Sequence, residues 1–236
     1  MVLVTVAIAF LFFRDSEELA TGIILAGTVP SGTSANVYTF IAGGEAALSL
    51  TMATMDTIIS PLLTPFLTQS FAGKLINIEF WPMFLNIIYV VFVPLFIGLF
   101  IQWRFTKKVE KIRPHTAILS QLSLFIIVLS VVSSAQASLA SNLSILPMLF
   151  VAVFLQVAIP MLSGYGIALL LKIERPYAIA ILFHTGICNS ALAATLAMEH
   201  ISSLAAVPAV ANMVMNLTLG AIVANYFHKK SEFSEV

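Results

Sequence analysis

Long apolar stretches, separated by short polar connections, run through the whole of this 236-residue chain. A helix needs about 20 apolar residues to cross the roughly 30 Å hydrocarbon core of a bilayer. Seven stretches reach that length, whereas the first is too short, because thirteen residues make only about 20 Å of helix. The stretches are 1–13, 19–42, 46–69, 82–103, 115–139, 145–171, 177–198 and 204–227. This pattern predicts an all-α polytopic membrane protein.

The composition agrees with a lipid environment. Hydrophobic residues make up 60% of the chain and charged residues 9%, against about 25% charged residues in ordinary soluble domains. Eleven basic and eleven acidic residues give no net charge, which excludes the basic surface that nucleic-acid binding requires. The expected partners are therefore membrane lipid and a small solute, with no nucleic acid.

The distribution of lysine and arginine predicts the orientation of the chain. When successive connections are assigned to alternate sides, nine of the eleven basic residues fall on one side and only Arg14 and Lys74 on the other. Cytoplasmic loops carry the excess of basic residues. We therefore expect a multi-pass protein of the cell inner (plasma) membrane with a cytoplasmic C-terminus.

The segment 27-GTVPSGTSAN-36 interrupts one of the most apolar stretches. Proline removes a backbone donor and disfavours helical conformation in the residue before it, so Pro30 and Gly32 predict a break near the middle of 19–42. Unpaired backbone groups are costly in hydrocarbon and occur only inside a helix bundle or beside water. The break is therefore expected to face the interior of the protein.

A second segment of the same kind, 184-HTGICNS-190, interrupts 177–198, which runs in the opposite direction. Two matched broken helices of opposite direction indicate an inverted-repeat secondary transporter, whose binding site lies where the breaks meet. The half-helix N-termini there suit an organic anion, and the oxygens at the breaks suit a small cation. The alternative is that the small residues only allow close helix packing.

Four motifs in and beside these breaks resemble those of the bile acid:sodium symporter family, in particular its bacterial pantoate and pantothenate branch. They are 32-GTSAN-36, 43-GGEAALS-49, 60-SPLLTP-65 and 186-GICNSALA-193. The resemblance implies ten helices in two inverted five-helix repeats, with the fourth and ninth helices unwound and crossing. It also implies that 1–13 is the end of the third helix and that the first two helices are absent from this sequence.

The same resemblance divides the chain into three parts. They are 1–69, the end of the first repeat with the third to fifth helices; 70–139, the panel-type sixth and seventh helices; and 140–236, the second core half with the eighth to tenth helices and a cytoplasmic tail. The implied function is cation-coupled symport of a small organic anion, such as pantoate, pantothenate or a bile acid. Neither an enzymatic activity nor a resident cofactor is expected.

The resemblance also assigns residues to the site. The implied substrate-binding residues are Thr33, Asn36, Asn189 and Ser190, and the implied ligands of a coupling Na⁺ are Asn36, Ser49 and Asn189. Other oxygen ligands of the family are displaced or missing. Ser34 lies one place before the expected serine, and His184 and Cys188 stand where the family has a glutamate and a glutamine. Imidazole and thiol are poor ligands for a hard cation, which weakens the expectation of sodium.

An acid lies where the family motif commonly has a hydroxyl. Asp56 is about ten residues, or roughly 15 Å of helix, into 46–69. An ionisable group near mid-membrane is costly unless it has a partner, and His184 is the candidate partner. The residues expected to take part in ion coupling are Ser34, Asn36, Ser49, Asp56 and His184. Our hypothesis is that Asp56 and His184 form a titratable pair that binds H⁺ in place of Na⁺; the alternative is that Asp56 accepts hydrogen bonds from the unwound backbone.

Two other functions stay open. An intramembrane hydrolase would use Ser31 or Ser34 together with His184 and Asp56, but no recognised nucleophile motif accompanies these residues. The other possibility is an inactive fragment that lacks its first helices. Labelling by a serine-reactive phosphonate that is lost in Ser31→Ala or Ser34→Ala would support the hydrolase. Uptake measured with and without the upstream genomic sequence would separate an inactive fragment from a transporter.

Overall fold

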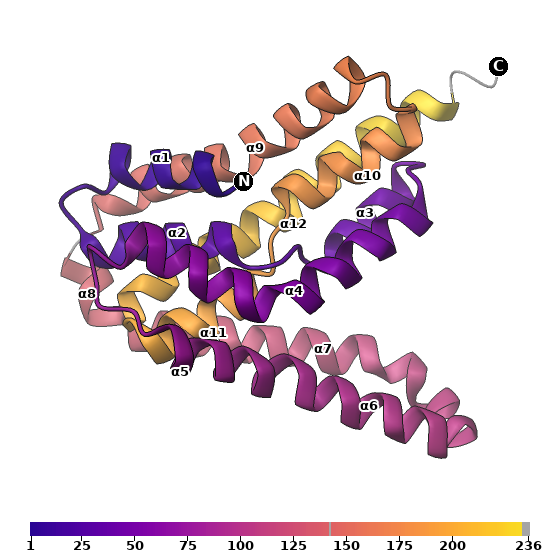
Figure 1. Ribbon diagram of the computed structural model, residues 1–236, viewed down its shortest axis with the longest axis horizontal. Coiled ribbons are helices and arrows are strands. Elements are labelled where there is room, and N and C mark those ends of the chain that lie inside the picture. The colour runs from indigo at the N-terminus through magenta and orange to yellow at the C-terminus, as the bar shows by residue number, and fades with distance from the viewer. Residues whose placement is uncertain (142, 233–236) are drawn as a thin grey trace.

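The computed structural model describes residues 1–141 and 143–232, and helices account for nearly all of them (Figure 1). The first half contains α1 (Val2–Phe12), α2 (Glu17–Thr28), α3 (Ser34–Ile41), α4 (Ala46–Ala72), α5 (Phe80–Ile87), the π-helical turn η1 (Ile88–Phe92) and α6 (Val93–Arg104). The second half contains α7 (Thr106–Ser134), α8 (Gln136–Ser141), α9 (Ile145–Leu170), α10 (Arg175–Gly186), α11 (Ser190–His200) and α12 (Ser203–Glu232). The described residues contain no β-structure beyond one isolated bridge.

Within the described residues, four helical runs are long and apolar enough to cross a membrane. They are α4, the run of α5, η1 and α6 over Phe80–Arg104, α9, and the part of α12 over Ser203–Lys229. The predicted stretches 19–42 and 177–198 are each divided between two shorter helices, α2 with α3 and α10 with α11. The prediction of an all-α polytopic membrane protein is confirmed.

The connection between the predicted stretches 82–103 and 115–139 is almost entirely helical. Phe105 alone separates α6 from α7. Lys, Glu and Arg have high helix propensity, so the charged run stays helical, and the cationic groups of Arg104 and Lys108 lie 5.3 and 5.6 Å from the centroid of the Phe105 ring. Helix α7 also ends before the predicted boundary, and the short α8 follows it.

Helix α2 lies in the core of the molecule. Every residue from Leu19 to Thr28 is buried, and the helix contacts α1, α4, α11 and α12. Gly22 allows the approach of α12, because a Cβ at this position would collide with the carbonyl oxygen of Ala205. Small residues permit such close contacts between membrane helices. The bundle therefore holds the first half of one broken helix on several sides.

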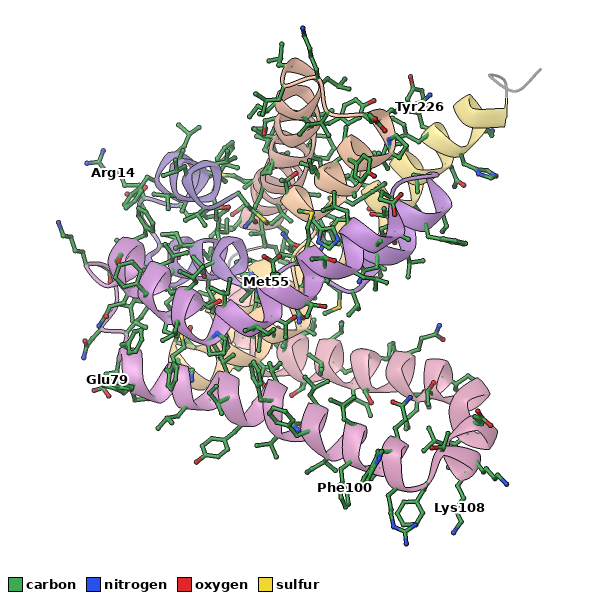
Figure 2. All side chains as sticks on the ribbon, turned by 45° about the vertical axis from the view of Figure 1, so that its right-hand side comes forward. Arg14, Met55, Glu79, Phe100, Lys108 and Tyr226 are labelled. Carbon is green, nitrogen blue, oxygen red and sulfur yellow. The ribbon has the colours of Figure 1, made fainter. Side chains whose placement is uncertain are left out.

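Helices α6 and α7 lie side by side as an arm along one edge of the molecule (Figure 1). Their exposed side chains are mostly large and apolar, as a surface that faces lipid requires. Figure 2 places Lys108 at the end of this arm and Tyr226 at the same end of the molecule, with Arg14 and Glu79 at the opposite end. The polar connections thus gather at two opposite ends of the protein.

Contacts join the first and third of the predicted parts, 1–69 and 140–236. Helix α2 packs on α12, and α1 packs on α9, so these two parts form one body. The middle part, 70–139, touches this body through α5 with α4 and through α7 with α11 and α12. The assignment of the three parts to repeats stays a prediction.

Candidate functional site

Both predicted helix breaks are present. Helix α2 ends before Val29, which is extended (φ −69°, ψ 157°) as expected for a residue that precedes proline. Helix α10 ends before Ile187, which is also extended (φ −95°, ψ 111°). Helical conformation resumes with α3 and α11. Each predicted stretch is therefore two half-helices joined by a short unwound segment, 29–33 in the first and 187–189 in the second.

The two unwound segments pair with each other near the middle of the molecule (Figure 1). The backbone N–H of Gly32 donates to the carbonyl of Ile187 (3.0 Å), and the N–H of Asn189 donates to the carbonyl of Pro30 (2.8 Å). Backbone groups released by the breaks are thus satisfied inside the protein, which is the condition for unwound chain at membrane depth.

The close approach of the two segments requires a glycine at position 32. A Cβ there would lie 2.8 Å from the carbonyl oxygen of Cys188, and Cys188 itself forms the isolated antiparallel bridge with Ser31. The two atoms closest to this Cβ are the carbonyl oxygen and carbonyl carbon of Cys188. Backbone atoms do not rotate away as a flexible side chain does. Any larger residue at this position would therefore push the segments apart.

A cavity of about 180 Å³ lies where α3 and α11 begin. It is lined by residues 32–34 and 188–191 and by Met213, Asn216 and Leu217 of α12. Within the described chain, the backbone N–H groups of Thr33, Ser34 and Ala191 form no hydrogen bond. Helix starts carry unpaired N–H groups and a partial positive charge. This cavity, called the amide cavity below, therefore suits an anion.

A second cavity, of about 330 Å³, lies where α2 and α10 end. Its lining includes residues 27–31 and 184–188, apart from Gly186, and Asp56 and Ser60 of α4. Helix ends carry unpaired carbonyl groups and a partial negative charge. This cavity, called the carbonyl cavity below, therefore suits a cation, and Cys188 is the one residue in the lining of both cavities.

Asp56 provides the only carboxylate in the lining of the carbonyl cavity. It accepts a hydrogen bond from the backbone N–H of Ser31 at 3.3 Å. Within the described residues no hydrogen bond or ion pair joins Asp56 directly to His184; Ser31 contacts both, since its Oγ lies 3.0 Å from His184 Nδ1. This is the geometry of the alternative in which Asp56 binds unwound backbone, while a proton-binding role of the pair stays a prediction.

Side-chain hydrogen bonds run in a chain from Ser31 to Asn36. The imidazole of His184 contacts Ser31 Oγ through Nδ1 (3.0 Å) and Ser49 Oγ through Nε2 (2.8 Å). The hydroxyl of Ser49 donates to Asn36 Oδ1 (2.7 Å). Because this uses the only hydroxyl proton of Ser49, its oxygen accepts from Nε2–H of His184, and a neutral imidazole then accepts at Nδ1 from the Ser31 hydroxyl. In this series of hydrogen bonds, each group therefore donates in the direction from Ser31 to Asn36.

Three of the four predicted substrate-binding residues, Thr33, Asn189 and Ser190, line the amide cavity. The fourth, Asn36, is absent from this lining and accepts the hydrogen bond from Ser49 instead. Ser34, which was predicted for ion coupling, also lines the amide cavity. Its position at the start of α3 brings it beside Thr33 rather than beside the groups of the carbonyl cavity.

The predicted sodium ligands are divided between two places. Asn36 and Ser49 bond to each other, whereas Asn189 Oδ1 accepts the N–H of Leu192 (3.1 Å) and so caps the start of α11. In the described part of the chain, no group of three or more His, Cys, Asp or Glu side chains could hold a metal ion. The hydrogen bonds of the described residues therefore give no single cluster that contains all three predicted oxygens.

A buried polar cluster behind the amide cavity was missed by the sequence prediction. Ser190 Oγ donates to Asn212 Oδ1 (2.9 Å), and Asn216 Nδ2 lies 2.9 Å from Ser190 Oγ and 3.0 Å from the carbonyl oxygen of Cys188. The Oδ1 atom of Asn216 is buried and finds no partner among the described residues. The available signal was two asparagines four residues apart on one helix face within an apolar stretch.

The groups of the hydrolase alternative do not form a catalytic triad. Ser31 Oγ contacts His184 Nδ1, but Asp56 binds the backbone N–H of Ser31, and the other ring nitrogen of His184 contacts Ser49. In a triad the acid accepts a hydrogen bond from the imidazole and orients it. Within the described residues no acid holds His184 in this way, so this arrangement counts against a hydrolase.

Comparisons with known proteins agree with this geometry. The model of the sodium bile acid symporter family matches residues 1–142. The uncharacterized sodium-dependent transporter YocS of Bacillus subtilis (strain 168) is 35% identical over 213 residues, which are 90% of this chain and 65% of that protein. The probable sodium/metabolite cotransporter BASS1, chloroplastic, of Arabidopsis thaliana is 28% identical over 214 residues, which are 90% of this chain and 52% of that protein. This chain therefore spans about half to two thirds of the length of these relatives.

Proposed function

This chain belongs to the sodium bile acid symporter family, and we propose that it acts in secondary transport, moving a small organic anion across a membrane together with a cation. The predicted family is confirmed, and the multi-pass membrane architecture agrees with it. The relatives are named as a sodium-dependent transporter and a sodium/metabolite cotransporter, which supports sodium as the coupling ion. One observation carries the proposal: two helix starts converge on the amide cavity.

The amide cavity offers an anion both charge and hydrogen bonds. Thr33, Ser34 and Ala191 present N–H groups that no group in the described chain accepts. Each helix start adds a partial positive charge, and carboxylate groups bind well at such ends. A solute carboxylate would satisfy groups from both broken helices at once. Binding would therefore depend on the pairing of the two breaks.

The unpartnered Oδ1 of Asn216 supports a solute that also carries a hydrogen-bond donor. Asn216 is 4% exposed and lines the amide cavity. A buried acceptor without a partner is costly, so a solute hydroxyl or amide N–H at this point would improve binding. The cavity of about 180 Å³ is smaller than the roughly 300–1,000 Å³ of drug-sized sites. We therefore favour a small hydroxy acid such as pantoate over pantothenate or a bile acid.

We place the protein in the cell inner (plasma) membrane with a cytoplasmic C-terminus. Nine of the eleven basic residues fall in connections on one side of the predicted membrane, and such connections face the cytoplasm. Figure 2 supports this assignment, because Lys108 and Tyr226 lie at the same end of the molecule. Labelling of a single cysteine introduced beside Lys108, in intact cells and in opened cells, tests the orientation.

Binding of short hydroxy acids to the purified protein tests the proposed function. We expect an acid such as pantoate to raise the unfolding temperature with a saturable dose dependence, because only the folded state holds the amide cavity. The neutral amide of the same acid is the matched control and should have little effect, since it lacks the charge that the helix starts bind. Equal stabilisation by acid and amide, or by neither, would contradict an anion site. Uptake of the binding acid into proteoliposomes then tests transport.

A further inference from the structure

We propose that the end of the arm formed by α6 and α7 binds the headgroups of anionic phospholipids. The binding surface, called the basic tip below, consists of Trp103, Arg104, Phe105, Lys107 and Lys108. None of these residues lines the amide cavity or the carbonyl cavity. The inference therefore goes beyond the proposed function and depends on neither the solute nor the coupling ion.

Positive charge is concentrated around the basic tip. The segment 104–113 contains five basic residues and one acid, whereas the rest of the chain contains six basic and ten acidic residues. A net positive segment is thus part of a chain that is otherwise net negative. Basic clusters of this size directly beside a membrane helix attract anionic lipid headgroups. The sign and the density of the charge therefore suit an anionic membrane surface.

The basic tip lies at the level of the lipid headgroups. The run Phe80–Arg104 has 25 residues, or roughly 37 Å of helix, which exceeds the hydrocarbon core of about 30 Å. The two tryptophans of the chain, Trp81 and Trp103, lie near its two ends and are 67% and 76% exposed. Tryptophan is enriched at both membrane–water interfaces. Arg104 follows Trp103 directly, so its charge reaches the phosphate groups of the lipid.

The cations of the basic tip have no acidic partner in the part of the chain that the structure describes. Arg104, Lys107 and Lys108 are exposed and form no ion pair there. The cationic groups of Arg104 and Lys108 instead lie 5.3 and 5.6 Å from the centroid of the Phe105 ring. Such contacts hold a side chain in place without neutralising its charge. Two ordered cations therefore lie beside one ring, at an end of the arm that projects away from the other helices (Figure 1).

The charges at the start of α7 do not stabilise that helix. Lys107 and Lys108 lie in its first turn, which contains no acid. A helix N-terminus carries a partial positive charge, so cations there are unfavourable. Lipid phosphate groups within reach of these side chains would relieve the repulsion. The arrangement is therefore explained by an anionic partner outside the protein rather than by the stability of α7.

Quenching of tryptophan fluorescence by brominated lipids tests the basic tip. The full chain is reconstituted into vesicles of phosphatidylcholine with a fixed fraction of phosphatidylglycerol, and bromine is placed on the acyl chains of one lipid or the other. Trp81→Phe leaves Trp103 as the only tryptophan, which reports the lipid at the basic tip. Trp103→Phe leaves Trp81, which reports the opposite end. Phosphatidylglycerol should be preferred by at least about fivefold at Trp103, the effect of one basic residue near a membrane surface, and by less than about twofold at Trp81.

Two variants of the basic tip separate a built site from net charge. With Trp103 as the reporter, the double variant Arg104→Gln/Lys108→Gln should lose the preference for phosphatidylglycerol. Phe105→Leu keeps every charge but removes the ring that holds the two cations. It should lower the preference by about two- to fivefold, the effect of one cation–π contact at an exposed site.

Lys172→Gln/Lys229→Gln is the matched control, because it removes two exposed charges on the same predicted side of the membrane but outside the basic tip. It should leave the preference at Trp103 unchanged. The proposal is overturned if Trp103 shows no greater preference than Trp81, or if the Arg104→Gln/Lys108→Gln variant keeps the wild-type value. It is also overturned if inorganic phosphate, at constant ionic strength, abolishes the preference, since the tip would then bind a soluble anion. The comparison of the two tryptophans leaves all charges of the tip in place, so it decides even where the double variant does not fold.

Discussion

Asn189 donates its backbone N–H to the carbonyl of Pro30 across 2.8 Å, which links the start of α11 to the first unwound segment. Proline has no N–H of its own, so Pro30 enters this pairing as an acceptor. The side chain of Asn189 meanwhile accepts the N–H of Leu192 and caps α11. One residue therefore orders the second broken helix and joins it to the first, and the position of each helix start depends on the other break.

The substitution Gly32→Ala should destabilise the protein by roughly 1–3 kcal/mol, because the new Cβ would overpack the contact between the two breaks. The obstacle is the carbonyl oxygen of Cys188 at 2.8 Å, and relief requires movement of backbone. Chemical unfolding in detergent measures the change. Gly98→Ala on α6 is the control, since a Cβ at Gly98 meets nothing within 4 Å. Equal stability of the two variants would show that the crossing is looser than described.

The substitution Asn216→Ala should weaken binding of a hydroxy acid by roughly 10- to 100-fold relative to the wild type, the effect of losing one to two hydrogen bonds. Calorimetry with a hydroxy acid and with its deoxy analogue separates the solute contact from damage to the cavity. The deoxy acid should lose much less affinity, because it has no hydroxyl for Asn216 Oδ1. A parallel loss for both acids would contradict the role given to this atom. Thr218→Ala, at an exposed residue bonded to its own helix, is the control.

The substitution Ser49→Ala should lower the free energy of unfolding by about 1–3 kcal/mol. Ser49 is fully buried and bonds both Asn36 Oδ1 and His184 Nε2, so its removal leaves the buried His184 and the half-buried Asn36 without this partner. Thr51→Ala is the comparison on the same helix, because its hydroxyl is exposed and bonds only to the carbonyl of Ala47. If both variants unfold at the same denaturant concentration, the hydrogen bonds of Ser49 do not stabilise the protein and the prediction is wrong.

His200, beyond the apolar stretch at the end of α11, should make stability depend on pH. Burial lowers the pKa of His200 below its ordinary value of 6.5, and the charge of Glu199 opposes this shift. The unfolded chain therefore takes up the proton first as the pH falls, and stability is lost between about pH 6.5 and the lower pKa of the folded state. His200→Gln should lose less stability than the wild type between about pH 7.5 and 5.5. Identical pH profiles of the unfolding temperature would refute the assignment.

The helix breaks were predictable because their causes are local. Proline and glycine weaken helical conformation, so Pro30 and Gly32 predicted the first break. The second break was predicted from a similar run of glycine, hydroxyl and amide residues, 184-HTGICNS-190. Their pairing followed from the opposite direction of the two spans. The sequence also indicated the amide cavity, because Thr33 and Asn189 begin the two half-helices that meet there.

Other features depended on contacts that spacing along the chain does not reveal. The free Oδ1 of Asn216 arises because its amide nitrogen is held by Cys188 of the second unwound segment and by Ser190 at the start of α11. Ser31 was considered only as a nucleophile, since nothing local shows that it lies between Asp56 and His184. The helical course around Phe105 was missed because charged residues indicated a connection, whereas their helix propensity prevailed.

The bridge between Ser31 and Cys188 lies where the two cavities meet, because Ser31 lines the carbonyl cavity and Cys188 lines both. Under the proposed function, a solute carboxylate in the amide cavity and a coupling cation in the carbonyl cavity would attract each other across this bridge. Their charges cancel when each cavity holds one monovalent ion. The membrane voltage would then do no net work on the loaded protein, and transport would follow the two concentration gradients alone.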